Sequence, residues 1–345
     1  MSESLKTGVI NSKNFRQYFE KGTIDMVIKN HIKPGAVNCD SGKTLGYRIK
    51  TELILNRYLY ILLVPVLAYY IIFMYLPMFG LVMAFKDYSI GQGLMESPWV
   101  GLKYFKEFVN GIYFTRTLKN TLVISFASIL FGFPAPIIFA LLLNEINNGK
   151  FKKFVQTSTY LPHFISMVVI CGMVTSFFGT NGLITKIIVM LGGENINYIA
   201  SPQWFRTVFV ASDIWQGFGW GSIIYLSALS GVDEALYEAA TIDGAGRLKQ
   251  LWHITLPGIM PTIMIMLIMR LGSVMSVGYE KIILLYSPAT YEVADVISSY
   301  VYRMGIVGSR YSYSAAVGLF QSVINIFILF IANKVSDKMT ETSLF

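Results

Sequence analysis

The chain is poor in charge, cysteine and histidine, and each shortage excludes a class of protein. Only 14% of its 345 residues are charged, against about 25% in soluble domains, whereas 54% are hydrophobic. Two cysteines, Cys39 and Cys171, cannot form a disulfide framework. The three histidines, His31, His163 and His253, lack the spacing of a metal site. The composition therefore indicates an integral membrane protein and gives no support to a metalloenzyme.

Signals for nucleotide binding, catalysis and secretion are also lacking. Gly42-Lys43-Thr44 resembles the end of a phosphate-binding loop, but the glycine required five residues earlier is Val37. No nucleophile elbow is present, and the first apolar run begins near Tyr58, too late for a secretory signal peptide. We attribute the net charge of +8 to basic cytoplasmic flanks rather than to nucleic-acid binding. We expect no enzyme activity, no bound cofactor and no metal in this chain.

Six apolar segments are present, each near the ~20 residues that a spanning helix needs. They lack the alternation of barrel strands, so helices are expected. Pro65 and Pro77 predict a kink or tilt in the first segment. The predicted fold is an all-α membrane protein with six transmembrane helices, at about Tyr58–Phe85, Leu118–Leu143, Tyr160–Phe178, Thr207–Leu229, Ile259–Gly278 and Ser314–Asn333.

Lysine and arginine near the ends of these segments predict the orientation, because cytoplasmic flanks are enriched in them. The basic residues that share one side are Arg48, Lys50, Arg57, Lys150, Lys152, Lys153, Arg247, Lys249, Lys334 and Lys338. We therefore predict a multi-pass protein of the cytoplasmic membrane, with both termini cytoplasmic. Its parts would be a polar arm at 1–56, a transmembrane domain at 57–335 and a cytoplasmic tail at 336–345.

The longest polar-rich interruption, Asp233–Pro257, predicts two short helices around a glycine turn. Asp233 can cap the first helix, and Gly244 and Gly246 can end it. Pro257 and Pro261 mark the start of the next apolar helix. One face of the first helix is polar, with Glu234, Glu238 and Thr241. The neighbouring face is small, with Ala235, Ala239 and Ala240. A structured element of this kind between two spans should contact a partner.

Arg270 lies within the fifth predicted span. It follows Ile259 by eleven residues, so it lies about 16 Å along the helix and near the bilayer centre. A lipid-facing arginine there is costly, so the side chain should face the protein interior or a wet cavity and have a partner. Asp213 and Glu280 are candidate partners. Two interpretations stay open: a structural ion pair, or a group that meets the transported substrate.

Two further spans carry candidate substrate-pathway residues. The fourth combines flat aromatic faces with polar edges, at Trp215, Gln216, Trp220 and Tyr225. Such a mixture suits a sugar, but tryptophans also anchor helices at the interface or pack between them. Gln321 and Asn325, at i and i+4 on the sixth span, either line the same cavity or join helices by hydrogen bonds.

The stretch from 233 to 257 resembles the EAA loop of permease subunits of bacterial ABC importers. The pattern is carried by Glu238-Ala239-Ala240, Gly244, Ile254 and Leu256-Pro257. Over roughly residues 52–345 the chain is similar to six-span carbohydrate permeases of the polysaccharide and aldouronate transport systems, the LplB type. Supporting runs lie at 85–88, 97–102, 214–220, at Arg270 and at 277–280. Departures from the family pattern are Ser276 in place of asparagine and Lys281 in place of glutamine.

The resemblance implies a type I ABC importer permease fold with a cytoplasmic coupling helix. Such a chain would move an oligosaccharide or other carbohydrate by alternating access, driven by ATP with Mg²⁺ bound to a separate ATPase. It would assemble with a second permease subunit as a heterodimer, two ATPase subunits and an extracellular sugar-binding lipoprotein. The residues that the resemblance assigns to ATPase coupling are Glu234, Glu238, Ala239, Ala240, Asp243, Gly244, Leu256 and Pro257.

The alternative function is an ion-coupled secondary transporter that works without an ATPase. Such a transporter would need acidic relays within the membrane and often has inverted repeats. Asp213 is the only deep acid, and no repeat is evident. A third class, a membrane enzyme or signalling anchor, would need a catalytic cluster that the sequence lacks.

Overall fold

The computed structural model describes residues 54–340. Almost all of the predicted N-terminal arm, including Gly42-Lys43-Thr44, lies outside these residues, as do the last five residues of the predicted tail. The chain divides into two compact units, 1–74 and 75–345, which are described separately. The domain boundaries predicted at 56/57 and 335/336 stay predictions.

The described part of the first unit is helical. Helix α4, Arg57–Tyr70, contains Pro65 and buries none of its residues. A π-helical turn, Ile71–Tyr75, follows it. The whole helical run Arg57–Phe85 is apolar and long enough to cross a membrane, which matches the first predicted span. The change from α to π geometry falls between Pro65 and Pro77, the two prolines that predicted an irregular helix.

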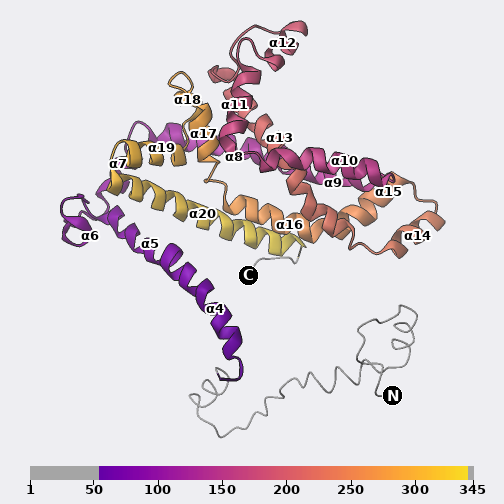
Figure 1. Ribbon diagram of the computed structural model, residues 1–345, viewed down its shortest axis with the longest axis horizontal. Helices are drawn as coiled ribbons and strands as arrows, with labels where there is room; N and C mark the ends of the chain where they lie inside the picture. The colour runs from indigo at the N-terminus through magenta and orange to yellow at the C-terminus, as the bar shows by residue number, and fades with distance from the viewer. Residues whose placement is uncertain (1–53, 341–345) are drawn as a thin grey trace, which may run out of the picture. The chain divides into compact units, whose positions relative to one another are not determined.

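The second unit is built from helices (Figure 1). Among its described residues, β structure is limited to one isolated antiparallel bridge between Lys86 and Trp99. Its first half contains α5 Leu76–Met78, a 3-10 segment Phe79–Phe85, α6 Gly93–Glu96, α7 Lys103–Val109, α8 Phe114–Gly132, α9 Pro134–Asn144, α10 Gly149–Tyr160, α11 Met167–Phe178 and α12 Leu183–Met190. Its second half contains α13 Pro202–Leu229, α14 Glu234–Ile242, α15 Arg247–Gln250, α16 Leu256–Gly272, α17 Tyr279–Leu285, α18 Tyr291–Ala294, α19 Ile297–Tyr302 and α20 Tyr311–Thr340.

Five helical runs of the described chain are long and apolar enough to span a membrane: 57–85, 114–144, 167–190, 247–272 and 311–334. The fourth predicted span corresponds to α13, which has 28 residues but is not among these five. Polar residues and glycines such as Asp213, Gln216 and Gly217 lower its hydropathy. Helix α13 nevertheless packs against α8, α9 and α16 and contributes to two of the hydrophobic clusters.

Two predicted spans are less regular than the sequence indicated. The third was expected as one helix from Tyr160 to Phe178, but α10 ends at Tyr160 and α11 begins only at Met167. Ser166 caps α11 by accepting a hydrogen bond from the Val169 N–H. The fifth was expected to reach Gly278, but α16 ends at Gly272 and residues 273–278 are not helical. The sixth predicted span lies entirely within α20.

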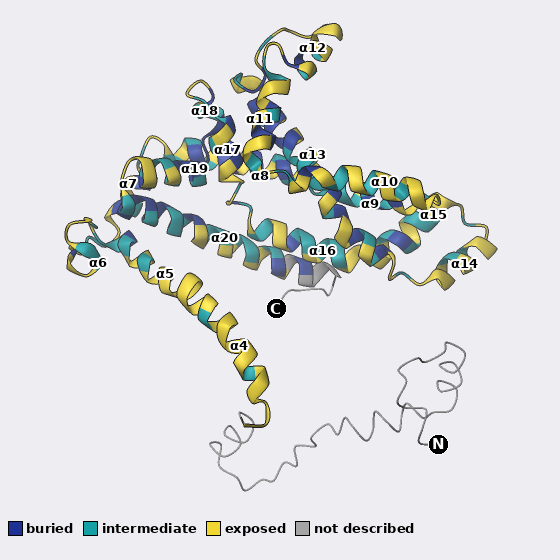
Figure 2. Ribbon diagram, in the orientation of Figure 1, coloured by how far each residue is buried: buried dark blue, intermediate teal, exposed yellow. Residues whose placement is uncertain are grey.

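Three clusters of buried apolar side chains hold the second unit together. One joins α11, α13 and α17 around Ile170, Phe209 and Ile282. Another joins α7, α19 and α20 around Phe108 and Tyr300. A smaller cluster lies where α9, α13 and α16 meet. Figure 2 shows buried residues along α20 and through the middle of the unit, whereas α14 and α15 have mostly exposed surfaces.

A buried carboxylate ties α8 to the chain around α18 and α19. The Asp295 side chain is fully buried, and its Oδ2 lies 2.5 Å from Arg303 Nη2 and 3.4 Å from Arg116 Nη2. The Ser299 hydroxyl donates to Oδ1 at 2.8 Å. Asn120 of α8 donates to the Asp295 backbone carbonyl at 3.0 Å. Charge and hydrogen bonds thus fix residues 295–303 against α8.

Candidate functional site

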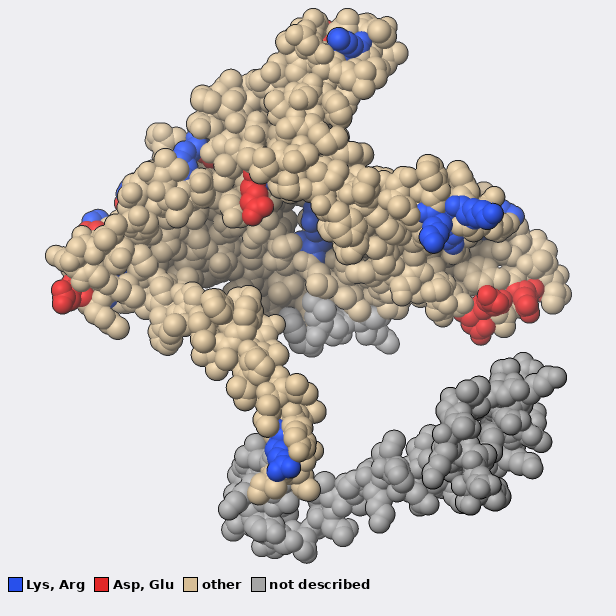
Figure 3. All heavy atoms as spheres, viewed as in Figure 1, with Lys and Arg blue, Asp and Glu red and all other residues tan. Residues whose placement is uncertain are grey.

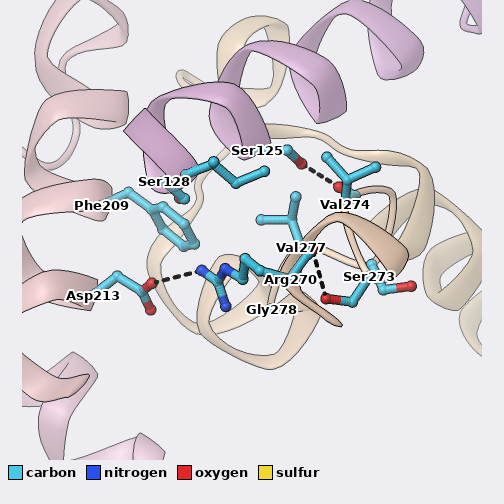
Figure 4. A pocket seen from close by; sticks show the side chains of 11 residues that line it. Ser125, Ser128, Phe209, Asp213, Arg270, Ser273, Val274, Val277 and Gly278 are labelled. Carbon is cyan, nitrogen blue, oxygen red and sulfur yellow. Dashed lines mark hydrogen bonds and ion pairs between the residues drawn. The ribbon is translucent and has the colours of Figure 1, made fainter. Parts of the chain in front are cut away.

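A cavity of about 250 Å³ opens between α8, α13 and the end of α16. Serine hydroxyls, the Phe209 ring and two charged side chains line it (Figure 4). The lining residues are Ser125, Ser128, Ile129, Phe209, Asp213, Arg270, Ser273, Val274, Ser276, Val277 and Gly278. Hydroxyls and charges inside a largely apolar bundle make this cavity suited to a polar ligand.

The two charged side chains of the cavity form a cluster with the buried Lys281, in which two cations face one carboxylate. Arg270 Nη2 lies 3.9 Å from Asp213 Oδ2, and both side chains are about half exposed. Lys281 Nζ lies 3.5 Å from the other oxygen, Oδ1. The predicted pairing of Arg270 with Asp213 is therefore present. Glu280, the other candidate partner, is exposed and forms no ion pair among the described residues.

The non-helical backbone from Ser273 to Gly278 forms one wall of the cavity. The N–H groups of Ser273, Val274 and Ser276 make turn hydrogen bonds to the backbone. Side chains from other helices pair further backbone groups of the segment. The Met275 N–H donates to Asn325 Oδ1 at 2.9 Å, and the Met275 carbonyl accepts from Gln321 Nε2 at 2.7 Å. The Ser125 hydroxyl donates to the Val274 carbonyl, as Figure 4 shows. Irregular backbone at membrane depth requires such partners.

Gln321 and Asn325 do not line the cavity, which was the first of the two roles predicted for them. Neither is among the residues that line the cavity of Arg270. Asn325 Nδ2 also donates to the Ser276 hydroxyl at 3.0 Å. Both side-chain amides therefore bind the 273–278 segment through hydrogen bonds. Their contacts match the second predicted role, in which the amides join helices by hydrogen bonds.

The two tryptophan candidates on α13 lie in other surroundings than the cavity of Arg270. Trp215 lines a separate apolar pocket with Phe177 and Phe178. Trp220 stacks on His163, with ring centroids 4.7 Å apart and planes 4° apart. Tyr225 is buried in the cluster between α9, α13 and α16, but it also lines a second pocket, of about 190 Å³, together with Asp213 and Arg270. Gln216 is partly exposed and is not among the lining residues of the cavity.

Sequence reasoning missed several residues of the cavity. Ser125 and Ser128 come from α8 and Phe209 from α13. The buried Lys281 of α17 does not line the cavity but forms an ion pair with Asp213, which does. A signal was present for the serines, because positions i and i+3 of an apolar helix share a face. Lys281 precedes the apolar run Ile282–Leu285, which indicates a buried helix start, but only the fold shows that Asp213 lies beside it.

The predicted helix pair is present as α14 and α15. Asp233 caps α14 by accepting a hydrogen bond from the Ala235 N–H at 3.0 Å. Gly244 has φ +74°, a left-handed conformation that favours glycine, and its position ends α14 as predicted. Gly246 instead has φ −71° and precedes α15, so its predicted role in ending the first helix was wrong.

Helix α14 presents an uncovered surface. None of its residues is buried, including Glu234, Glu238, Ala239 and Ala240. Apolar side chains of the pair are also exposed: Leu236 is 51% exposed, Ile242 86% and Leu248 73%. Figure 3 shows acidic side chains gathered at this end of the unit and basic ones over α10. A helix with no cover from its own chain needs a partner surface or solvent on that face.

The helix pair is nevertheless fixed to the following helix. The Tyr237 hydroxyl lies 2.9 Å from the Thr255 hydroxyl, and Gln250 Nε2 donates to the Thr241 hydroxyl at 3.0 Å. The chain then passes through a π-helical turn, Leu251–Thr255, into α16, which starts with Leu256 and Pro257. Arg270 lies fourteen residues further, about 21 Å along the helix. Helix α15 and Arg270 therefore lie near the two ends of one helical run, Arg247–Gly272, to which α14 is joined by hydrogen bonds.

Comparison with known proteins identifies relatives over most of the chain. Residues 117–341 match the family model described as binding-protein-dependent transport system inner membrane component. Protein LplB of Bacillus subtilis is 46% identical over 291 residues, covering 84% of this chain and 92% of the relative. The polygalacturonan/rhamnogalacturonan transport system permease protein YteP of the same organism is 42% identical over 299 residues, covering 86% of this chain and 93% of the relative.

A solved structure has the same fold. It is a chain of a bacterial ABC transporter involved in the import of the acidic polysaccharide alginate, with a TM-score of 0.79 and 42% identity, covering 85% of this chain and 99% of that one. A second structure of a bacterial alginate ABC transporter, in complex with an alginate pentasaccharide-bound periplasmic protein, also has a TM-score of 0.79, with 41% identity over 86% of this chain and 100% of that one.

Proposed function

The chain belongs to the family of binding-protein-dependent transport system inner membrane components, and on that premise we propose that it is the transmembrane permease subunit of an ATP-driven carbohydrate importer. The permease names of its relatives and the alginate transporters among its structural neighbours support a carbohydrate substrate. The uncovered helix α14, joined through α16 to a polar cavity, is the observation that carries the proposal.

We propose that α14 and α15 dock into an ATPase subunit on the cytoplasmic side, with both chain termini on that side. Small residues Ala239 and Ala240 permit close approach, and the exposed Glu238 offers a charge to a basic group. Because the pair is bonded to the start of α16, a movement of the docked ATPase would be passed to the helix that carries Arg270. This chain would bind neither ATP nor Mg²⁺ itself.

The proposed assembly contains a second permease subunit, two ATPase subunits and an extracellular sugar-binding lipoprotein. Alternating access requires two arrangements of the spans, and ATP-driven movement at α14 would select between them. Support for the binding protein comes from the structural neighbour solved with a periplasmic protein.

The test is co-purification of an ATPase subunit with the full chain, followed by ATP-dependent sugar uptake by the reconstituted assembly. Glu238→Lys should abolish uptake while the membrane subunits still assemble, because a like charge would face the basic partner. Glu96→Lys is the matched control, since Glu96 is also exposed but lies on α6, far along the chain from the helix pair. Uptake at the normal rate by Glu238→Lys would exclude the coupling role.

A further inference from the structure

Three lysines gather at the start of α10 without an acidic partner. Lys150, Lys152 and Lys153 lie within the first five residues of the helix, and none of them forms an ion pair among the described residues. Glu145, the acid that precedes them along the chain, is already paired with Arg247. Figure 3 shows basic side chains gathered over α10. These three lysines, called the basic patch below, are therefore a concentration of uncompensated positive charge.

Helix stability does not account for the basic patch. A helix N-terminus carries partial positive charge and disfavours cations in its first turn. The first turn of α10 contains no acidic residue that would offset them. Asn148 caps the helix and accepts hydrogen bonds from the N–H groups of Lys150 and Phe151 at 3.1 and 3.2 Å. The lysine ammonium groups, rather than open backbone donors, therefore carry the positive charge of this surface.

Two aromatic rings border the lysines on the exposed side of α10. Phe151 is 54% exposed and Phe154 is 69% exposed. Spaced three residues apart, the two rings form one stripe along the helix, and Lys150 and Lys153 form the neighbouring stripe. The opposite face packs against α13, where Thr159 is half-buried. An uncovered face with an apolar stripe beside a cationic stripe is typical of a helix at a membrane surface.

The basic patch lies at the depth of the lipid headgroups. The helical run 114–144 is long and apolar enough to span a membrane, and α10 begins five residues after this run ends. Lysine stems can lie along apolar surface and bring the ammonium group to a headgroup phosphate, while neighbouring aromatic rings contact the acyl chains. Under the orientation proposed above this is the cytoplasmic leaflet, whose surface is negatively charged.

We propose that the basic patch binds the headgroup of an anionic phospholipid, with the three lysines around its phosphate and Phe151 and Phe154 against the start of its acyl chains. The complementary charge and the headgroup depth favour a lipid as the occupant. A soluble anion would meet the lysines alone and leave both rings in water. The inference goes beyond transport, because it concerns the surface of α10 that faces away from α13 and from the cavity of Arg270.

The test titrates two lipids into the full-length chain with its co-purified subunits, stripped of lipid in detergent. The probes are dioleoyl phosphatidylglycerol, which is anionic, and dioleoyl phosphatidylcholine, which has the same acyl chains and no net charge. Native mass spectrometry gives the affinity for the first bound lipid of each kind. We expect the wild type to prefer phosphatidylglycerol. Replacement of all three patch lysines by glutamine should lower the phosphatidylglycerol-to-phosphatidylcholine affinity ratio about tenfold or more.

The matched control also loses three positive charges, but away from α10. It combines Lys106→Gln, Lys119→Gln and Lys186→Gln, which change exposed lysines of α7, α8 and α12, and its affinity ratio should equal that of the wild type. A second variant combines Phe151→Ala and Phe154→Ala. It should weaken the binding of both lipids about equally, because the two probes share the acyl chains that the rings contact. Thermal unfolding of each variant shows whether it is folded.

Four results would each overturn the inference. They are a wild type without preference for phosphatidylglycerol, an unchanged ratio in a folded patch variant, as expected if a partner subunit covers the lysines, an equal fall of the ratio in the patch and control variants, and displacement of bound phosphatidylglycerol by millimolar inorganic phosphate. ATP-dependent sugar uptake by the wild-type assembly is measured separately. Failure of lipid selectivity therefore leaves the proposed function standing, and failure of uptake leaves the lipid site standing.

Discussion

The side chain of Asn325 replaces a helical hydrogen bond for the backbone of Met275, a residue 50 positions earlier in the chain. The Met275 N–H donates to Asn325 Oδ1 at 2.9 Å, and Asn325 Nδ2 donates to the Ser276 hydroxyl at 3.0 Å. Met275 is fully buried, so no solvent can take over this role. The wall of the charged cavity therefore depends on a residue of another helix that does not line it.

Replacement of Asn325 by alanine should destabilise the protein. The buried Met275 N–H would lose its acceptor, which costs about 1–3 kcal/mol. The measurement is thermal unfolding of the purified protein in lipid nanodiscs. Ser322→Ala is the control, because the exposed Ser322 hydroxyl donates to the Gly318 carbonyl of its own helix. Equal stability of the two variants would contradict the assigned role of Asn325.

A methyl group at Gly219 should disturb the contact between α10 and α13. A Cβ there would lie 2.2 Å from the Thr159 carbonyl oxygen, which belongs to the backbone and cannot turn aside. We expect Gly219→Ala to cost about 1–3 kcal/mol or more in stability. Gly217→Ala is the matched control, since nothing lies within 4 Å of a Cβ at that position. The prediction fails if both variants unfold at the same temperature.

Asp295→Asn should unfold the segment 295–303 or the whole chain at lower temperature. The substitution leaves Arg303 and Arg116 without their shared buried carboxylate, and loss of one partner of a buried ion pair costs about 3–5 kcal/mol. Hydrogen exchange of residues 295–303 is the sensitive measurement. Glu292→Gln, an exposed position on α18, should leave exchange unchanged. Equal exchange rates in the two variants would show that the carboxylate is dispensable.

Tyr104→Phe should remove a pH-dependent contribution to stability. The Tyr104 hydroxyl donates to Asp87 Oδ1, which together with nearby Lys103 lowers the pKa of Asp87 below its usual value. A lowered carboxyl pKa adds stability above the unfolded-state pKa, which is lost as the pH falls through the folded-state value. The melting-temperature difference between wild type and Tyr104→Phe should therefore be full at pH 7 and shrink below about pH 4. A melting-temperature difference that grows as the pH falls would contradict this prediction.

The sequence predicted most of the helices because apolar length and helix caps are local signals. Asp233 and Gly244 specify the start and the end of α14 within a few residues of chain, and the structure has both features. The helix break at 273–278 could not be predicted in this way. Its hydrogen-bond partners, Asn325 and Gln321, lie on a helix far along the chain.

The charged site was predicted only in part for the same reason. A deep arginine requires a partner, which correctly suggested Asp213, but the sequence offered Glu280 equally. The place of Lys281 depends on how the short helix α17 packs beside α13, a tertiary relationship with no local signature. The aromatic residues of α13 looked suited to a sugar, yet helix rotation turns Trp215 and Trp220 toward other pockets and rings.

The modest hydropathy of α13 has a consequence for how the protein is made. Helices leave the translocon for lipid according to their own apolar content, and a central aspartate opposes that step by about 2.5–3.5 kcal/mol. Helix α13 carries Asp213 and is not among the five runs apolar enough to span a membrane. Its contacts with α8 and α9 are available as it emerges, whereas α16 is synthesised later. Insertion of α13 should therefore be cooperative, so that a chain ending at Leu229 inserts this helix only when α8 and α9 precede it.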